Sequence, residues 1–166
     1  MYWTRGTGVV YQAWLAAMDR HVAIKVLCTA SSDAKSIERF RTETRAAAML
    51  EHNHIIPVYA SGTIQGLPYY SMRFISGHSL DQIIAQREHK PASVGTIEEQ
   101  LLQFANVADA LDAAHQEGIV HRDIKPSNIL CDEQGKFWIA DFGLARIAAN
   151  ISLTRSGELL GTIRYM

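Results

Sequence analysis

The hydrophobic pattern in the first half of the chain predicts a small antiparallel sheet with one helix. Residues 8–15 and 22–27 are β-prone runs that flank a polar segment, which is typical of a hairpin. Residues 31–51 carry apolar side chains at helical intervals behind several possible N-cap residues. Residues 55–59 and 68–75 predict two further strands, with glycines in the turn between them.

The second half changes from strands to helices after a predicted hinge at residues 76–77. A long helix is expected over residues 96–117, because Thr96 and Glu99 have the spacing of a capping box at its start. The residues expected on its apolar side are Leu101, Leu102, Ala105, Ala108, Leu111 and Ala114. Short strands and loops are expected over residues 119–146.

Composition narrows the function classes. The chain has 166 residues, of which 48% are hydrophobic and 20% charged, as in a folded globular protein. Sixteen basic and seventeen acidic residues give a net charge of −1, so no basic excess favours a nucleic acid or an anionic membrane. No apolar run approaches the roughly 18–20 residues of a membrane helix. Cys28 and Cys131 lack metal-ligand spacing and are interpreted as reduced thiols of a cytoplasmic protein.

Three short motifs carry charged residues at fixed spacing. Residues 121–128 read HRDIKPSN, residues 141–143 read DFG and residues 22–25 read VAIK. Together they resemble the catalytic loop, the metal-binding motif and the nucleotide-binding strand of protein kinases. The resemblance implies an α+β, bilobal protein-kinase-like fold. A small antiparallel-sheet N-terminal lobe with one helix would occupy residues 1–75, and a partial, mainly helical C-terminal lobe would occupy residues 76–166.

The resemblance implies ATP and Mg²⁺ as cofactors and assigns roles to the charged residues. Asp123 would orient the acceptor hydroxyl and take its proton, while Lys125 would neutralise the γ-phosphate. Lys25 would bind the α- and β-phosphates, and Glu43 would be the carboxylate that holds it. The two residues that would supply hard oxygen ligands for Mg²⁺ are Asn128 and Asp141.

The resemblance also implies an adenine pocket. Val10 and Ala23 would cover the base from above and Leu130 from below, and Met72 would close the back of the pocket. The backbone groups of Arg73 and Ile75 would hydrogen-bond the edge of the base. Gly8 is the one residue in register with the family's glycine-rich turn, since Trp3 and Arg5 stand where two other glycines belong. No role is assigned to Trp138.

The acceptor class follows from the same motif. Lys125 within HRDIKPSN resembles serine/threonine kinases, and the overall motif style is similar to bacterial ones, so the expected partner is a protein with a Ser or Thr acceptor. Arg122 beside Asp123 resembles kinases that are switched by a phosphate on the activation segment. Thr154 and Ser156 are either the acceptors of that phosphate or ordinary loop hydroxyls. Thr162 resembles the family's substrate-docking threonine.

Two departures from the family pattern lead to alternatives. The first strand of the N-terminal lobe and the later helices of the C-terminal lobe are expected to be absent, so the chain is interpreted as a kinase-domain fragment truncated at both ends. Phosphotransfer would then require the missing parts, and Leu101, Leu102 and Leu111 could not all be buried. The alternative is a non-catalytic kinase remnant that acts as a binding or regulatory module. A small-molecule kinase on a related fold is a third hypothesis.

Overall fold

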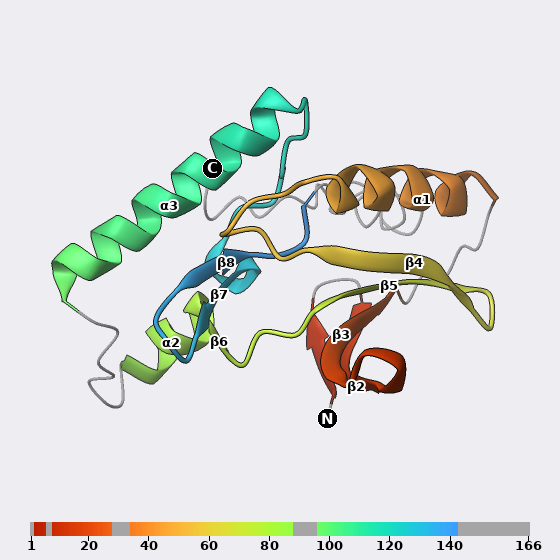
Figure 1. Cartoon of the computed structure of the whole chain (residues 1–166), viewed down its shortest axis with the longest axis horizontal. Coiled ribbons are helices and arrows are strands. Elements are labelled where there is room, and N and C mark those ends of the chain that lie inside the picture. Colours follow the sequence, from red (N-terminus) through yellow and green to blue (C-terminus); the bar gives the residue numbers. More distant parts are fainter. Residues whose placement is uncertain (1, 6–7, 28–33, 88–95, 143–166) are drawn as a thin grey trace, which may run out of the picture.

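The computed structural model describes residues 2–5, 8–27, 34–87 and 96–142 of the chain. Its N-terminal lobe is a five-stranded antiparallel sheet with the strand order β1-β2-β3-β5-β4. The strands are β1 (Tyr2–Arg5), β2 (Gly8–Leu15), β3 (Arg20–Leu27), β4 (Val58–Ile64) and β5 (Leu67–Arg73). One helix, α1 (Ala34–Ala48), accompanies this sheet (Figure 1). The predicted hairpin and helix are therefore present. The predicted strand pair is present too, but its first strand lies later than expected, so that Gly62, expected in the turn, lies within β4 and pairs with Tyr69.

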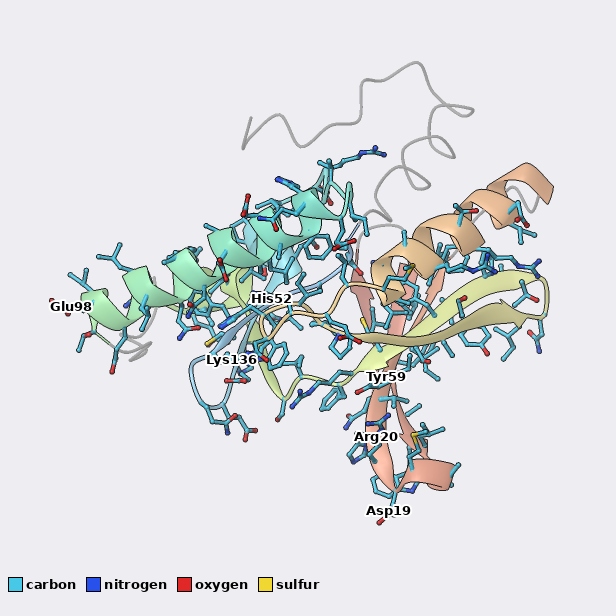
Figure 2. The ribbon with its side chains drawn as sticks, turned by 45° about the horizontal axis from the view of Figure 1, so that its top comes forward. Asp19, Arg20, His52, Tyr59, Glu98 and Lys136 are labelled. Atoms are coloured by element: carbon cyan, nitrogen blue, oxygen red, sulfur yellow. The ribbon has the colours of Figure 1, made fainter. Side chains whose placement is uncertain are left out.

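The strands form where the sequence alternates. In β5, Pro68, Tyr70 and Met72 are buried while their neighbours are more exposed, as expected for a sheet with one covered face. The β2–β3 hairpin turns through a short 3₁₀ segment, Ala16–Met18, followed by Asp19 in the left-handed conformation with φ 48°. Asp19 lies at the tip of the hairpin, away from both helical regions (Figure 2).

The C-terminal lobe combines two helices with a small sheet in the order β6-β7-β8. Its elements are β6 (Gly77–Ser79), α2 (Leu80–Arg87), α3 (Ile97–Gln116), the 3₁₀ turn Pro126–Asn128, β7 (Ile129–Asp132) and β8 (Phe137–Ile139). The capping box is confirmed, because the Thr96 hydroxyl accepts from the Glu99 N–H and the Glu99 carboxylate accepts from the Thr96 N–H. Gly77, at the predicted hinge, lies so close to β7 that a Cβ there would meet the Cys131 carbonyl oxygen at 2.0 Å.

The two lobes share their hydrophobic cores. Ala47, Leu50 and Ile55 of the N-terminal half belong to a cluster that is otherwise built from the C-terminal lobe. Trp138 and Ala140 join a cluster that is otherwise built mostly from the N-terminal sheet. The segment before β4 also pairs with β8, since the Ile56 N–H donates to the Ile139 carbonyl at 2.9 Å and the Ile139 N–H donates to the His54 carbonyl at 2.7 Å.

Two expectations about these elements are wrong. A strand does precede Gly8, because β1 pairs with β2 from Tyr2↔Tyr11 to Arg5↔Gly8. Tyr, Trp and Thr are β-prone types, and the unpaired edge of β2 offers them hydrogen-bonding partners.

The buried side of α3 also differs from the predicted one. Val107 and Ala110 are buried in place of most of the predicted set, of which only Ala114 is buried and Leu111 is partly buried. Leu101 and Leu102 are 64% and 60% exposed, so the expectation that the three leucines could not all be buried is confirmed. The Gln103 side-chain oxygen accepts the Phe137 N–H at 3.0 Å, which turns this side of the helix toward β8.

In the described part of the chain, no helix is long and apolar enough to cross a membrane. Cys131 is a free, buried thiol whose pKa is raised by burial and by the charge of Asp132. Cys28 lies outside the described residues.

Candidate active site

A pocket lies where the N-terminal sheet meets β7. The side chains that line it are Val10, Ala23, Ile56, Met72, Arg73, Phe74, Ile75, Leu130 and Asp141. This set contains every residue that the resemblance placed around an adenine ring: the apolar residues Val10, Ala23, Met72 and Leu130, and also Arg73 and Ile75, whose backbone groups were expected to bond the base. The walls come from β2, β3 and β5 on one side and from β7 on the other, so the pocket exists only where the two lobes meet.

Gly8 is subject to a steric constraint within the sheet, in addition to the role in phosphate binding that the resemblance implies. It pairs with Leu27 across the β2–β3 hairpin, and a Cβ at this position would lie 2.6 Å from the Val26 carbonyl oxygen. Any larger residue would have to push the two strands apart. The close approach of β3 is therefore one reason for a glycine at this position.

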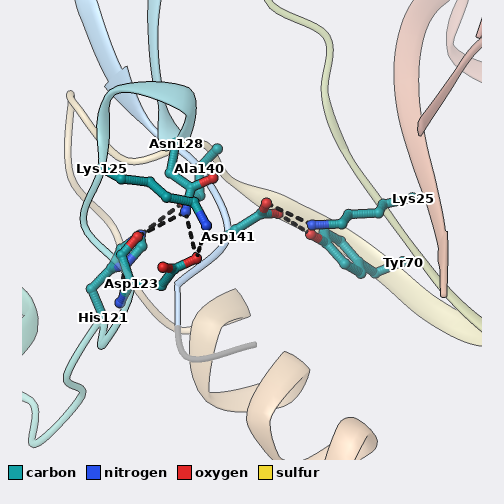
Figure 3. A network of polar contacts seen from close by, with 8 residues as sticks. All are labelled: Lys25, Tyr70, His121, Asp123, Lys125, Asn128, Ala140 and Asp141. Atoms are coloured by element: carbon teal, nitrogen blue, oxygen red, sulfur yellow. Dashed lines mark hydrogen bonds and ion pairs between the residues drawn. The ribbon is translucent and has the colours of Figure 1, made fainter. Parts of the chain in front are cut away.

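Lys25 and Asp141 connect the two lobes at the pocket. The Lys25 Nζ lies 2.6 Å from the Asp141 Oδ2, and both side chains are largely buried. The Tyr70 hydroxyl donates to the other carboxylate oxygen of Asp141, Oδ1 (Figure 3). Burying a charge is costly unless it is paired, so this ion pair compensates two charges that would otherwise be unfavourable. Glu43 lies in α1, but its side chain is outside the described part of the structure.

The catalytic-loop motif forms a second charged group beside the first. The Lys125 Nζ lies 2.7 Å from the Asp123 Oδ2. The buried amide of Asn128 donates to the Asp123 backbone carbonyl at 2.8 Å and to its carboxylate at 3.1 Å (Figure 3). Because the amide nitrogen is used in this way, the side-chain oxygen of Asn128 is the atom that could ligate a cation. Pro126 begins the 3₁₀ turn that brings Asn128 back to Asp123.

His121 holds the two charged groups together. Its ring is 1% exposed, its Nε2 lies 2.8 Å from the Ala140 carbonyl, and its Nδ1 lies 3.3 Å from the Asp123 N–H. A carbonyl can only accept and an N–H can only donate, so Nε2 carries the proton and Nδ1 is the acceptor. Burial lowers the pKa of His121, although the Ala140 carbonyl and the charges of Asp141 and Asp123 oppose this shift. The Phe142 ring packs edge-on against the imidazole at 4.8 Å.

Two residues at this site have left-handed backbone conformations. Arg122 has φ 68° and Asp141 has φ 65°. Such values are uncommon for residues other than glycine, and they persist only where the surrounding contacts enforce them. Thr154, Ser156 and Thr162 lie outside the described residues.

The charged residues fit a cation that is bound together with phosphate. In the described part of the chain, no group of three or more His, Cys, Asp or Glu side chains could hold a metal ion by itself. Mg²⁺ is typically held by one or two protein oxygens together with substrate phosphates and water. Asp141 and Asn128 could supply that number of hard oxygens, and Lys25 and Lys125 could supply positive charge for phosphates.

Sequence reasoning gave no role to several residues of this site: Ile56 and Phe74 of the pocket lining, His121, Tyr70 and Trp138. Tyr70 occurs two residues before Met72 in the same strand, so the period of two places both on one face, and this signal could have found it. The Trp138 indole N–H donates to the Asp132 carboxylate at 2.8 Å. Its ring lies 4.7 Å from the Arg73 guanidinium and 4.0 Å from the Lys136 ammonium. No spacing in the sequence indicates that Trp138 contacts Arg73.

Comparison with known proteins identifies relatives over nearly the whole chain. Residues 5–166 match the family model of the protein kinase domain. The chain is 38% identical over 167 residues to the probable serine/threonine-protein kinase pknA2 of Bifidobacterium longum, which covers 97% of the chain and 21% of that protein. It is 37% identical over 162 residues to the serine/threonine-protein kinase PknL of Mycobacterium tuberculosis, covering 97% and 39%. PrkC of Bacillus subtilis, also a serine/threonine-protein kinase, is 36% identical over 163 residues, covering 97% and 24%. The chain thus spans less than half the length of these relatives.

Solved structures agree with this result. The crystal structure of the M. tuberculosis PknI kinase domain is similar with a TM-score of 0.72 and 35% identity, covering 86% of this chain and 56% of that one. PpkA-294 in its apo form has a TM-score of 0.73 at 25% identity, covering 90% and 59%. The α+β bilobal fold expected from the sequence is therefore confirmed.

Proposed function

The chain belongs to the protein kinase family, and we propose that it carries the nucleotide-binding and catalytic residues of a serine/threonine kinase. The reaction is transfer of the γ-phosphoryl group of ATP to a Ser or Thr hydroxyl of a protein. The observation that carries this proposal is the contact between Lys25 and Asp141 at 2.6 Å, next to the pocket and to Asp123. Residues 116 positions apart in sequence meet where a nucleotide phosphate and a cation would have to meet.

The pocket supports adenine binding by this chain. Val10 and Ala23 lie on the N-terminal sheet and Leu130 lies on β7, so a flat ring would be held between apolar surfaces. The Arg73 N–H already donates to the Pro57 carbonyl at 3.1 Å. The Arg73 carbonyl and the Ile75 N–H are therefore the groups proposed to hydrogen-bond the base.

The charged residues support phosphoryl transfer. Mg²⁺ supplies positive charge for the phosphate oxygens when it is bound, and Asn128 and Asp141 are the residues proposed to hold it. Lys25 binds the α- and β-phosphates, and Glu43 is proposed to hold Lys25 in that position. Asp123 orients the acceptor hydroxyl and takes its proton, while Lys125 neutralises charge on the transferred group.

His121 supports this chemistry as a positioning residue. Its neutral ring bonds the Asp123 N–H on one side and the Ala140 carbonyl on the other. The proton acceptor and the metal-binding segment are thereby held at a fixed separation. In this structure Asp141 is paired with Lys25 and Asp123 with Lys125. When a nucleotide and its cation bind together, the phosphates would take over the pairing with the lysines and the cation would compensate the negative charge of the carboxylates.

The substrate and regulation are proposed from the relatives' printed names and from the motif. Acceptors are Ser and Thr residues of proteins, because PknL and PrkC are serine/threonine-protein kinases. Arg122 would bind a phosphate on Thr154 or Ser156 and so couple the activation segment to Asp123. The cytoplasm is the proposed location, because cellular ATP is available there and Cys131 is a free thiol.

Nucleotide binding and transfer are tested separately. Isothermal calorimetry of the chain with Mg–ADP is expected to show binding that Lys25→Met weakens at least about tenfold, because this change removes a charge-assisted contact to phosphate. Transfer of labelled γ-phosphate to a serine-containing protein is then measured on the chain and on its fusion to the C-terminal remainder of a relative's kinase domain. Asp123→Asn is expected to reduce transfer about 10²- to 10⁴-fold.

The matched control is Asp112→Asn. Asp112 is an exposed carboxylate on α3 whose described partner is Gln116, so its replacement leaves binding and transfer unchanged. Full transfer by Asp123→Asn would contradict the catalytic assignment.

A non-catalytic binding module is the second candidate. It is favoured by the apolar residues that α3 leaves exposed: Ile97, Leu101, Leu102 and Phe104. Nucleotide binding without transfer, in both the chain and the fusion, would support this candidate instead.

A further inference from the structure

Tyr70 and Lys25 form a pair of donors on one face of the N-terminal sheet. They are direct register partners between β3 and β5, so their side chains leave the sheet side by side. Lys25 is 6% exposed and Tyr70 is 1% exposed. Both donate to the same carboxylate, Lys25 to Oδ2 at 2.6 Å and Tyr70 to Oδ1 of Asp141.

This pair turns Asp141 away from the other proposed cation ligand. In Figure 3, the Asp141 side chain extends toward Lys25 and Tyr70, while the Asn128 side chain is directed to Asp123. Both oxygens of the Asp141 carboxylate therefore face a donated hydrogen from the N-terminal sheet. A cation shared by Asp141 and Asn128 needs at least one of these oxygens. Each donated hydrogen occupies one of the lone-pair sites of its oxygen and fixes the carboxylate toward the sheet, so the carboxylate must reorient before both residues can ligate one cation.

The two donors differ in what they can do when a nucleotide arrives. The Lys25 ammonium can exchange one anion, the carboxylate, for another, the phosphates. The Tyr70 hydroxyl is neutral and buried, and its ring packs at 6.2 Å from Phe40 of α1 in the sheet's own cluster. Tyr70 therefore keeps its position after Lys25 leaves.

We propose that Tyr70 is a positioning residue that holds Asp141 in a resting orientation against the N-terminal sheet. This contact raises the concentration of divalent cation at which the nucleotide site is loaded. The inference rests on the proposed function, since it takes Asp141 to be a cation ligand. It adds to that function a residue that sets how readily the cation is bound.

The experiment measures cation binding and not turnover. The unbound Mn²⁺ signal in electron paramagnetic resonance is followed while Mn²⁺ is titrated into the chain with saturating ADP. Tyr70→Phe removes one oxygen and keeps the ring, and it is expected to lower the half-saturating Mn²⁺ concentration about three- to tenfold, because a hydrogen bond to a charged group no longer opposes loading. The control is Tyr69→Phe, which removes a hydroxyl from the opposite face of β5 and leaves the value unchanged.

The direction of the change separates the proposal from a merely structural role. Loss of packing or order at the site would weaken Mn²⁺ binding, so unchanged or weaker binding by Tyr70→Phe overturns the proposal. Should Tyr70→Phe fail to fold, Tyr70→Met removes the same hydroxyl and is expected to shift binding in the same direction. A wild-type chain that binds no Mn–ADP would contradict the proposed function and this inference together. Binding by the wild type with no shift in either variant would contradict this inference alone.

Discussion

His121 makes the stability of the site depend on pH. Burial lowers the pKa of its ring in the folded chain, so below about pH 6.5 the unfolded chain binds a proton that the folded chain resists. The contribution of His121 to stability is complete above that pH and is lost as the pH falls toward its lower folded pKa. We expect the free energy of unfolding to fall with decreasing pH by up to about 1.4 kcal/mol per unit from this residue alone.

Urea unfolding of the wild type and of His121→Gln, at about pH 7.5 and pH 5.5, measures this contribution. The glutamine variant is less stable at the higher pH, because the buried bonds are disturbed, and it loses less stability on acidification than the wild type does. Equal losses in the two proteins would show that His121 is not the responsible group.

Trp138 supports the hinge side of the pocket. Arg73, which lines the pocket, contacts its ring, and the ring is 6% exposed. Trp138→Leu removes both the aromatic face and the indole N–H, and it is expected to weaken ADP binding about three- to tenfold as Arg73 loses a contact of about 1 kcal/mol and the wall of the pocket relaxes. Trp138→Phe keeps an aromatic face and loses only the bond to Asp132, so calorimetry should show a smaller effect. ADP binding by Trp138→Leu that equals the wild type would contradict a supporting role.

Single residues were predictable to the extent that their chemistry is local in sequence. Asp123, Lys125 and Asn128 fall within one eight-residue motif, so their proximity follows from the chain itself. The contacts of Asp141 with Lys25 and Tyr70 depend on how two lobes meet, and no periodicity in either segment describes that meeting. The side of α3 that is buried was mispredicted for the same reason. Apolar residues lie on several sides of this helix, and contact with β8 selects one of them.

At the scale of the element, α1 contains a buried polar group that lowers the stability of the fold. Thr44 is 1% exposed, and its hydroxyl is the buried side-chain oxygen that lacks a hydrogen-bond partner in the described part of the chain. Valine has the same shape and about the same helix propensity but no polar atom. We therefore expect Thr44→Val to raise the free energy of unfolding by about 1 kcal/mol.

The matched control for this change lies in the same helix. Thr42 is exposed, and its hydroxyl donates to the Glu38 carbonyl at 3.0 Å. Thr42→Val should change stability by less than about 0.5 kcal/mol in the same urea titration. Destabilisation by Thr44→Val would mean that its hydroxyl has a partner.

At the scale of the whole molecule, we expect the lobes to unfold as one cooperative unit. Each hydrophobic cluster draws residues from both sides of the hinge, and Ile139 joins the lobes through its two backbone bonds to residues 54 and 56. Ile139 is 0% exposed, so Ile139→Ala should leave a cavity that costs about 2–5 kcal/mol. Because the cores are shared, the loss should appear equally in both lobes.

Tryptophan fluorescence in two single-tryptophan proteins tests this expectation. One protein retains Trp14 of β2 and the other retains Trp138 of β8, with phenylalanine at the remaining tryptophan positions. Unfolding midpoints from the two probes should coincide before and after Ile139→Ala, and both should move to lower urea. Ile84→Ala, at a residue 52% exposed on α2, should move neither by more than about 0.5 kcal/mol. A Trp14 transition that stays in place while the Trp138 transition shifts would show that the N-terminal sheet unfolds independently. The site between the lobes would then open by local unfolding while the rest of the chain stays folded. The buried ion pair of Lys25 and Asp141 would in that case stabilise the site against local opening and not the whole molecule against unfolding.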